Sequence, residues 1–269
     1  MAQCLKANSE SRTCKNTTFI TETQKINFDF WRTWFYSAIV IYGAKTMDKA
    51  AAQFDAQKIA AAISNEIGLL PIQDTPHIRA IRRTYSKKLR DAPARFVLAV
   101  ARGIVSRYNN RWVAFELIYH HDAALRSIGE AEITEFGCDL NSWGAVDAFA
   151  GYLAGPAWMN DQIPDELIYQ WARSPDRWLR RTALVCTVVL NSPSFGGKGD
   201  TLRTLAVCRL LVADKDDMVV KAMSWALRRL VAHDPDAVQK FISEHKDVLA
   251  ARIKREVRNK LETGRKHPR

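Results

Sequence analysis

The fold is decided by two stretches of the chain, DRWLRRTALVCTVVL at residues 176–190 and DMVVKAMSWALRRLV at residues 217–231. Each begins with Asp, a favoured helix N-cap, and continues with apolar residues three and four positions apart, as one face of an amphipathic helix requires. The two stretches begin 41 positions apart. Pairs of helices that stack as HEAT-class repeats recur every ~40–47 residues, so this spacing predicts a repeat of that class.

Comparable helix signals follow one another from residue 47 to the C-terminus. No Asn-Gly or Asp-Gly hairpin signal interrupts them. We therefore predict an all-α fold, a right-handed α-α superhelix (solenoid) of HEAT-like repeats over residues 47–269 with a basic concave cleft. The residues that signal helix starts are Asp74 with Pro76, Pro93, Asn110, Ser142, Pro164, Asp176, Asp200, Asp216, Asp234 and the segment His245–Asp247.

Residues 1–46 differ from the rest, and we expect an N-terminal appendage there that lies outside the fold. The apolar run at residues 28–44 contains Asp29 and Arg32 and is shorter than the ~20 residues that a membrane-spanning helix needs. It also lacks the basic lead of a signal peptide. We expect no membrane association, and an alternative is that residues 1–46 precede a true start at Met47.

Charge is distributed in blocks. Residues 79–107 carry nine basic and one acidic residue (net +8), residues 110–172 carry two and ten (net −8), and residues 173–269 carry 21 and 11 (net +10). If the two basic blocks share a face, that face suits a polyanion, nucleic acid first. Separate solvated helix faces would give the same counts, so charge alone leaves both readings open.

Trp225 occupies an unusual position on its predicted helix. It lies opposite the apolar face, beside Lys221 and Arg228. One interpretation is an aromatic wall of a binding site, with Arg228 reaching a phosphate. The other is that a neighbouring helix covers the indole.

Trp143 and Asp147 are four residues apart and share the flank of another predicted helix. Asp is a poor helix former away from caps, so its presence in the helix interior needs a reason. The carboxylate can stabilise a developing positive charge, or it can pair with an Arg across a helix interface, which spacing alone favours.

Arg181 stands at the edge of a helix that is apolar almost all round. It therefore needs an anion, either Asp147 or a phosphate. We expect Arg180, which points elsewhere, to be a surface charge. The five Cys have no metal-ligand spacing, and we expect Cys186 and Cys208 to be small buried hydrophobes in a reducing compartment. Nucleotide-loop and nucleophile motifs are absent, and no metal or cofactor is expected.

Several stretches in order resemble one family. They are Thr75-Pro76 with Arg79, Trp143-Gly-Ala-Val-Asp147, Trp171-Ala-Arg-Ser-Pro, Trp178-Leu-Arg-Arg-Thr-Ala and Trp225-Ala-Leu-Arg228. From about Met47 the chain resembles the DNA alkylation repair enzyme family, the bacterial alkylpurine DNA glycosylases built from HEAT-like repeats. Here only one clear helix precedes the Thr75-Pro76 start, whereas members of the family have more helical scaffold there.

The resemblance implies a DNA repair hydrolase that excises N3- or N7-alkylated purines from double-stranded DNA without base flipping. Asp147 would be the catalytic carboxylate, and Trp143 and Trp225 would be aromatic walls. Arg181 and Arg228 would contact phosphates, and Lys221 and Arg177 lie beside them as further DNA-binding residues. We expect a cytoplasmic monomer associated with the bacterial nucleoid.

Two other functions stay open at this point. One is a non-catalytic HEAT-repeat DNA-binding protein that recognises damaged or branched DNA. The other is a protein–protein solenoid whose basic blocks meet an acidic partner.

Overall fold

The computed structural model describes residues 55–107 and 110–267, which belong to one compact unit. The predicted boundary between residues 46 and 47, and the apolar run at 28–44, lie outside the described residues. Helices account for nearly all of the regular structure, and residues 55–107 and 110–267 contain no strand. The predicted all-α class is confirmed. No helix of this described part is long and apolar enough to cross a membrane.

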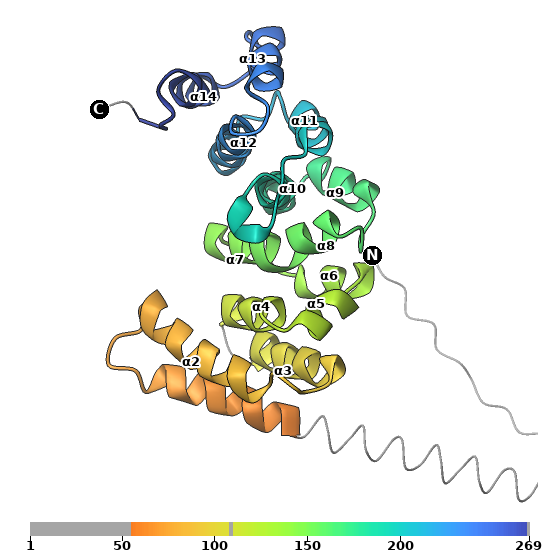
Figure 1. Cartoon of the computed structure of the whole chain (residues 1–269), viewed down its shortest axis with the longest axis vertical. Helices are drawn as coiled ribbons and strands as arrows, with labels where there is room; N and C mark the ends of the chain where they lie inside the picture. Colours follow the sequence, from red (N-terminus) through yellow and green to blue (C-terminus); the bar gives the residue numbers. More distant parts are fainter. Residues whose placement is uncertain (1–54, 108–109, 268–269) are drawn as a thin grey trace, which may run out of the picture. The chain divides into compact units, whose positions relative to one another are not determined.

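A helical segment at residues 55–68 precedes the labelled helices (Figure 1). The first group comprises α2 (Thr75–Lys88), α3 (Ala94–Arg107), α4 (Arg111–Tyr119), α5 (Asp122–Ser127), α6 (Glu130–Phe136), α7 (Trp143–Phe149), the π-helix η1 (Ala150–Ala154) and α8 (Gly155–Met159). The second comprises α9 (Asp165–Ala172), α10 (Arg177–Leu190), the 3-10 helix η2 (Pro193–Phe195), α11 (Thr201–Leu210), α12 (Asp217–Leu230), α13 (Pro235–Glu244) and α14 (Ala251–Thr263).

Local sequence explains where most of these helices begin. The carboxylate of Asp74 accepts the backbone N–H of His77 at 3.0 Å, and Pro76 stands in the first turn of α2, as predicted. Asp176, Asp200, Asp216 and Asp234 cap α10, α11, α12 and α13 in the same way. These predicted starts are confirmed.

The last helix begins later than predicted. The sequence placed its start at His245–Asp247, whereas α14 begins at Ala251. The backbone N–H groups of Val248 and Leu249 both donate to the carbonyl of His245, so this segment is a turn that follows α13. Leu249 is buried within that turn. The free energy gained by burying its side chain favours the turn over a helix in this segment.

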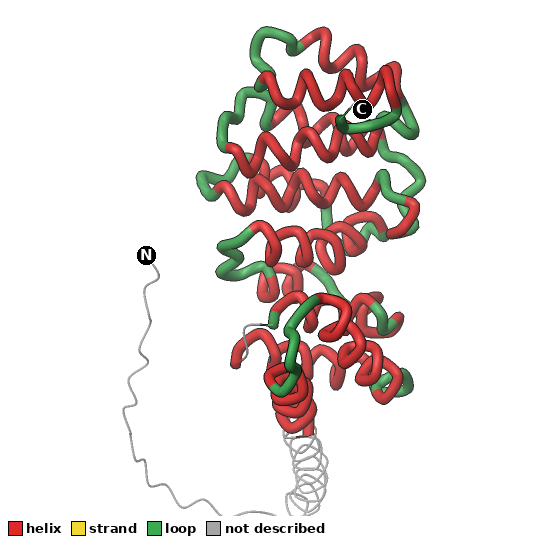
Figure 2. The backbone as a smooth tube through the Cα atoms, turned by 90° about the vertical axis from the view of Figure 1, so that its left-hand side faces the viewer, coloured by secondary structure: helices red, strands yellow, loops and turns green. Residues whose placement is uncertain are grey.

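One set of helices packs in series. In the order α2, α4, α7, α10, α12 and α14, each helix contacts the next, and α3, α9, α11 and α13 each pack beside members of this series. Figure 2 shows the resulting stack of helices. This arrangement puts α7, α10 and α12, which carry the candidate site residues, on consecutive levels. The right-handed HEAT-like superhelix and its basic concave cleft remain predictions.

The apolar core runs through this stack. In α10, every residue from Arg181 to Leu190 is buried, as expected for a helix that is apolar almost all round. Cys186 and Cys208 are fully buried, which confirms their prediction as small hydrophobes. Burial raises the pKa of both thiols, that of Cys208 to about 12, so neither is a reactive thiolate.

A π-helix joins α7 to α8 without a break. The backbone N–H of Gly155 donates to the carbonyl of Ala150, five residues earlier. Pro156 follows at once and has no N–H to donate. The widened turn before Pro156 keeps the helix continuous past a residue that would otherwise end it. The helix therefore runs from Trp143 to Met159 and includes the fully buried Trp158.

Candidate catalytic carboxylate and its surroundings

α7 presents Trp143 and Asp147 on one flank. The hydroxyl of Ser142 accepts the backbone N–H of Ala145 at 3.4 Å and sets the start of the helix at Trp143. The indole of Trp143 is 62% exposed, which is unusual for the largest apolar side chain. Asp147 lies one turn later, and 20% of its side chain is exposed. A mostly buried carboxylate therefore lies one helical turn from an exposed aromatic ring.

Arg181 of α10 holds this carboxylate by two parallel hydrogen bonds. Its Nε donates to Oδ1 of Asp147 at 2.9 Å, and its NH2 donates to Oδ2 at 2.8 Å. Its NH1 donates to the backbone carbonyl of Met218, in α12, at 2.7 Å. The bidentate fork fixes the plane of the carboxylate as well as its position. The Asp147 side chain is thus oriented by residues from two other helices.

The sequence left Asp147 and a phosphate as alternative anions for Arg181, and the structure places Asp147 there. All three guanidinium nitrogens donate within the protein, and the residue is only 6% exposed. We therefore assign Arg181 to positioning the carboxylate. A direct contact between Arg181 and a DNA phosphate stays an untested prediction.

Burial raises the pKa of the Asp147 carboxyl, and the hydrogen bonds and positive charge of Arg181 oppose that rise. The two effects have different consequences. Low local polarity strengthens the interaction of the carboxylate with any charge that develops beside it. The guanidinium favours the ionised form of the carboxyl and so opposes the effect of burial.

Trp225 and Arg228 of α12 are more enclosed than the sequence interpretation as a binding wall assumed. Trp225 is partly buried and packs against the core, so neighbouring residues cover part of the indole. The Nε of Arg228 donates to the hydroxyl of Ser224 at 3.3 Å and lies 3.7 Å from the carboxylate of Glu256. Burial lowers the pKa of the Arg228 guanidinium. Their contact with DNA stays a prediction.

Lys221 and Arg177 are the more exposed of the predicted DNA-binding residues. The ammonium of Lys221 lies 2.6 Å from the carboxylate of Asp217, one turn away. Arg177 lies 3.5 Å from the carboxylate of Asp216, and its guanidinium lies over the ring of Trp178 at 5.3 Å. Both cations are about half exposed, and an ion pair of an exposed cation contributes little to stability.

Arg180 differs from its prediction as a surface charge. Only 19% of its side chain is exposed, and its Nε donates to the carboxylate of Asp214 at 2.7 Å. Its NH1 also donates to the carbonyls of Ser174 and Pro175. These bonds tie the start of α10 to the segment before α12. Helix periodicity places Arg180 away from the apolar face of its own helix, but cannot show that this neighbouring segment covers it.

Sequence reasoning missed a second buried carboxylate, Glu116 of α4. It is 1% exposed, and it accepts a hydrogen bond from the Nε of Arg79 at 2.7 Å and one from the Nε of Arg82 at 3.2 Å. The NH2 of Arg79 also donates to the hydroxyl of Tyr152 at 3.1 Å. The signal was a lone Glu inside the apolar run WVAFELIY, which demands a cation from elsewhere.

The basic and acidic blocks of the sequence therefore neutralise each other in part. Arg79 and Arg82 face Glu116, and the Nε and NH2 of Arg102 both donate to the carboxylate of Glu135. Not all of the basic block is free to form one positive face. In the described ranges, no three His, Cys, Asp or Glu side chains form a group able to hold a metal ion.

The comparisons with known proteins agree with the family resemblance of the sequence. Neither the curated proteins nor the solved structures provide a match. A family model described as DNA alkylation repair enzyme matches residues 44–261, which include α2 to α13, most of α14 and every candidate site residue. With most of its length matched, the chain belongs to the DNA alkylation repair enzyme family.

Proposed function

We propose that the protein is a DNA glycosylase that hydrolyses the N-glycosidic bond of N3- or N7-alkylated purines in duplex DNA. Membership of a DNA alkylation repair family supports the substrate class. The observation that carries the proposal is the Asp147 carboxylate, held by two bonds from Arg181 one turn from the exposed Trp143. The arrangement suits a fixed negative charge that acts on a bound ligand.

The chemistry needs only one carboxylate. An N3- or N7-alkylated purine already carries a positive charge, so it departs as a neutral base when the bond to C1′ breaks. Positive charge then develops on the deoxyribose, and a preorganised carboxylate stabilises it. A water oxygen forms the new bond to C1′ and releases a proton. In this proposal Asp147 stabilises the sugar cation and orients the water.

The surrounding side chains suit DNA. The exposed face of Trp143 can pack against the lesion-bearing deoxyribose, and its ring electrons favour a cation nearby. Trp225 of α12 is the second proposed wall. Arg177, Lys221 and Arg228 are the proposed phosphate contacts. The proposed role of Arg181 is indirect, because it holds the Asp147 carboxylate in position.

The decisive test uses a duplex that contains N7-methylguanine, with the free base measured by mass spectrometry. The wild-type protein releases the base, and Asp147→Asn lowers the rate by about a hundredfold or more, the usual effect of removing a preorganised charge. Duplex binding stays near the wild-type level. Asp236→Asn, an exposed carboxylate on α13, is the matched control and keeps full activity.

Release at an unchanged rate by Asp147→Asn would remove Asp147 from the chemistry. A second candidate function is a non-catalytic protein that binds damaged or branched DNA. The observation in its favour is that the Asp147 carboxylate is already paired with Arg181, as in an ion pair that only joins α7 to α10. Tight, salt-dependent binding without any base release would support that candidate.

A further inference from the structure

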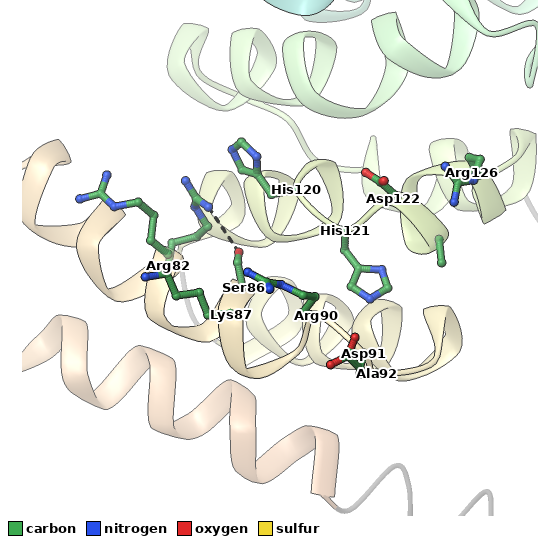
Figure 3. Close-up of a pocket in the computed structure, with 12 residues that line it drawn as sticks. Arg82, Ser86, Lys87, Arg90, Asp91, Ala92, His120, His121, Asp122 and Arg126 are labelled. Atoms are coloured by element: carbon green, nitrogen blue, oxygen red, sulfur yellow. Dashed lines mark hydrogen bonds between the residues drawn. The ribbon is translucent and has the colours of Figure 1, made fainter.

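A basic pocket lies away from Asp147, at the C-terminal ends of α2 and α4 (Figure 3). Its volume is about 690 Å³, within the usual range for small-ligand sites, about 300–1,000 Å³. Three segments form it, namely the end of α2 with the loop after it, the end of α4, and α5. Its lining residues are Arg82, Arg83, Ser86, Lys87, Arg90, Asp91, Ala92, His120, His121, Asp122, Ala123 and Arg126.

Positive charge on one side of α2 is the main feature of this pocket. Arg83 and Lys87 are four residues apart on α2, so they lie on one side of it, and Arg90 follows in the turn after the helix. None of the three side chains has a hydrogen bond or ion pair within residues 55–107 and 110–267. Like charges at this spacing repel each other in the absence of an anion. A bound anion would remove that repulsion.

The rest of the pocket compensates this charge only in part. Arg126 of α5 adds a fourth cation without a partner among the described residues, and Asp91 and Asp122 supply only two carboxylates. Arg82 is already paired with Glu116. Positive potential is also felt by His120, whose pKa is lowered first by burial and then by the charge of Arg82.

His121 provides an independent observation. The residue is 7% exposed, and its Nδ1 accepts the backbone N–H of Ala124 at 3.0 Å. In the neutral ring the proton is therefore on Nε2, and that buried donor has no partner. Figure 3 shows the ring directed toward the loop that carries Asp91 and Ala92. The lining of the pocket thus includes one residue with an unsatisfied buried donor, together with four cations whose side chains have no partner among the described residues.

We propose that this pocket is a second anion site and binds a phosphate group. Guanidinium and ammonium groups from separate segments match a phosphate, which accepts several charge-assisted hydrogen bonds at once. The pocket lining includes no Phe, Tyr or Trp, so recognition rests on charge and not on stacking with a base. The phosphate can belong to a DNA backbone or to a free phosphate ion, and the experiment separates these sources.

The test follows the ring nitrogens of His121 by NMR in the full-length protein during titration with inorganic phosphate. A parallel titration with sodium chloride at matched ionic strength controls for screening. We expect phosphate, and not chloride, to shift the His121 signals with a saturable dissociation constant. The double variant Lys87→Gln/Arg90→Gln weakens that constant about tenfold or more. Arg209→Gln, an exposed arginine on α11, leaves it unchanged.

A second arm uses a short undamaged DNA duplex. If the duplex shifts the His121 signals and phosphate competes with it, the site takes a backbone phosphate. If phosphate alone shifts them, the site takes a free phosphate. Should neither ligand shift His121, or should the double variant respond like the wild type, the proposal is wrong. His121→Asn retains an N-cap side chain and removes the ring N–H, so weaker binding by a folded His121→Asn protein, measured by calorimetry, gives a second check.

The inference does not depend on the glycosylase proposal. Failure of phosphate binding would leave base release by Asp147 untouched. Conversely, a protein without glycosylase activity would still bind phosphate here.

Discussion

Arg181 donates from Nε and NH2 to the two carboxylate oxygens of Asp147, at 2.9 and 2.8 Å, across the interface between α10 and α7. This pair makes the ionisation of Asp147 depend on a residue 34 positions away in the sequence. Burial raises the pKa of Asp147, and Arg181 limits that rise. The pair therefore predicts how the proposed base release responds to pH.

The acid limb of the pH–rate profile should lie above the ordinary Asp value of 3.8, because the proposed reaction needs the ionised carboxylate. Arg181→Lys keeps a charge but loses the second hydrogen bond, so its acid limb should move to higher pH. Single-turnover release of N7-methylguanine across pH measures this. An Arg181→Lys profile that coincides with the wild type would contradict the coupling.

Stability should respond to pH in the direction that a raised pKa requires. The unfolded chain loses the Asp147 proton at the ordinary pKa, whereas the folded chain retains it to higher pH. Between the two pKa values the folded state binds more protons, so this group makes the free energy of unfolding fall as pH rises. Denaturant unfolding of wild type and Asp147→Asn, compared across that range, isolates the contribution. If the free energy of unfolding of the wild type rose with pH relative to that of Asp147→Asn, the prediction would be wrong.

Trp143→Ala should separate function from stability. The indole is 62% exposed, so its removal should change the free energy of unfolding by no more than about 0.5 kcal/mol. Base release should nevertheless fall, since the proposed wall is lost. Leu202→Ala is the matched control, because Leu202 is 84% exposed on α11 and should affect neither quantity. Equal activity of Trp143→Ala and Leu202→Ala would exclude Trp143 from the site.

Glu116→Gln should destabilise the fold strongly. It leaves Arg79 and Arg82 facing an interior site without their counter-charge, and breaking a buried pair costs about 3–5 kcal/mol. Glu135→Gln breaks the exposed pair with Arg102 and should cost about 1 kcal/mol or less. Chemical denaturation compares the two directly. If both variants lost the same stability, Glu116 would not hold α2 against α4.

Removing Arg177 and Lys221 should reduce the salt dependence of duplex binding. Each phosphate contact contributes about 0.9 to the slope of log binding constant against log salt. Arg177→Gln/Lys221→Gln should therefore lower that slope by about 1 to 2, with similar weakening for damaged and undamaged DNA. Arg209→Gln serves as the exposed control. An unchanged slope in the double variant would place both residues outside the DNA contact.

The helix starts and the paired residues Trp143 and Asp147 were predictable because their signals are local. Asp176 caps α10 through a backbone N–H two residues away, and helical periodicity alone puts Trp143 beside Asp147. The start of α14 was wrong because burial of Leu249, a tertiary effect, holds the preceding segment as a turn. The helix propensity of one segment does not show which of its side chains are buried by neighbouring segments.

For contacts between helices, the sequence predicted that a charged side chain needed a partner, but not which residue that partner was. Arg181 at the edge of an apolar helix required an anion, and Asp147 was one of two choices. Arg180 was predicted to be a surface charge because its carboxylate partner, Asp214, lies 34 residues away in the sequence. Glu116 was missed for the same reason, since Arg79 and Arg82 reach it from α2.

The third hydrogen bond of Arg181 determines how substitutions between α10 and α12 would affect the protein. NH1 donates to the carbonyl of Met218 while Nε and NH2 donate to Asp147, so one side chain links α7, α10 and α12. Any slip between α10 and α12 therefore displaces the proposed catalytic carboxylate. Substitutions deep in that seam, remote from solvent, should silence repair while the protein still folds and accumulates normally, so a survey of expression alone would pass them as harmless.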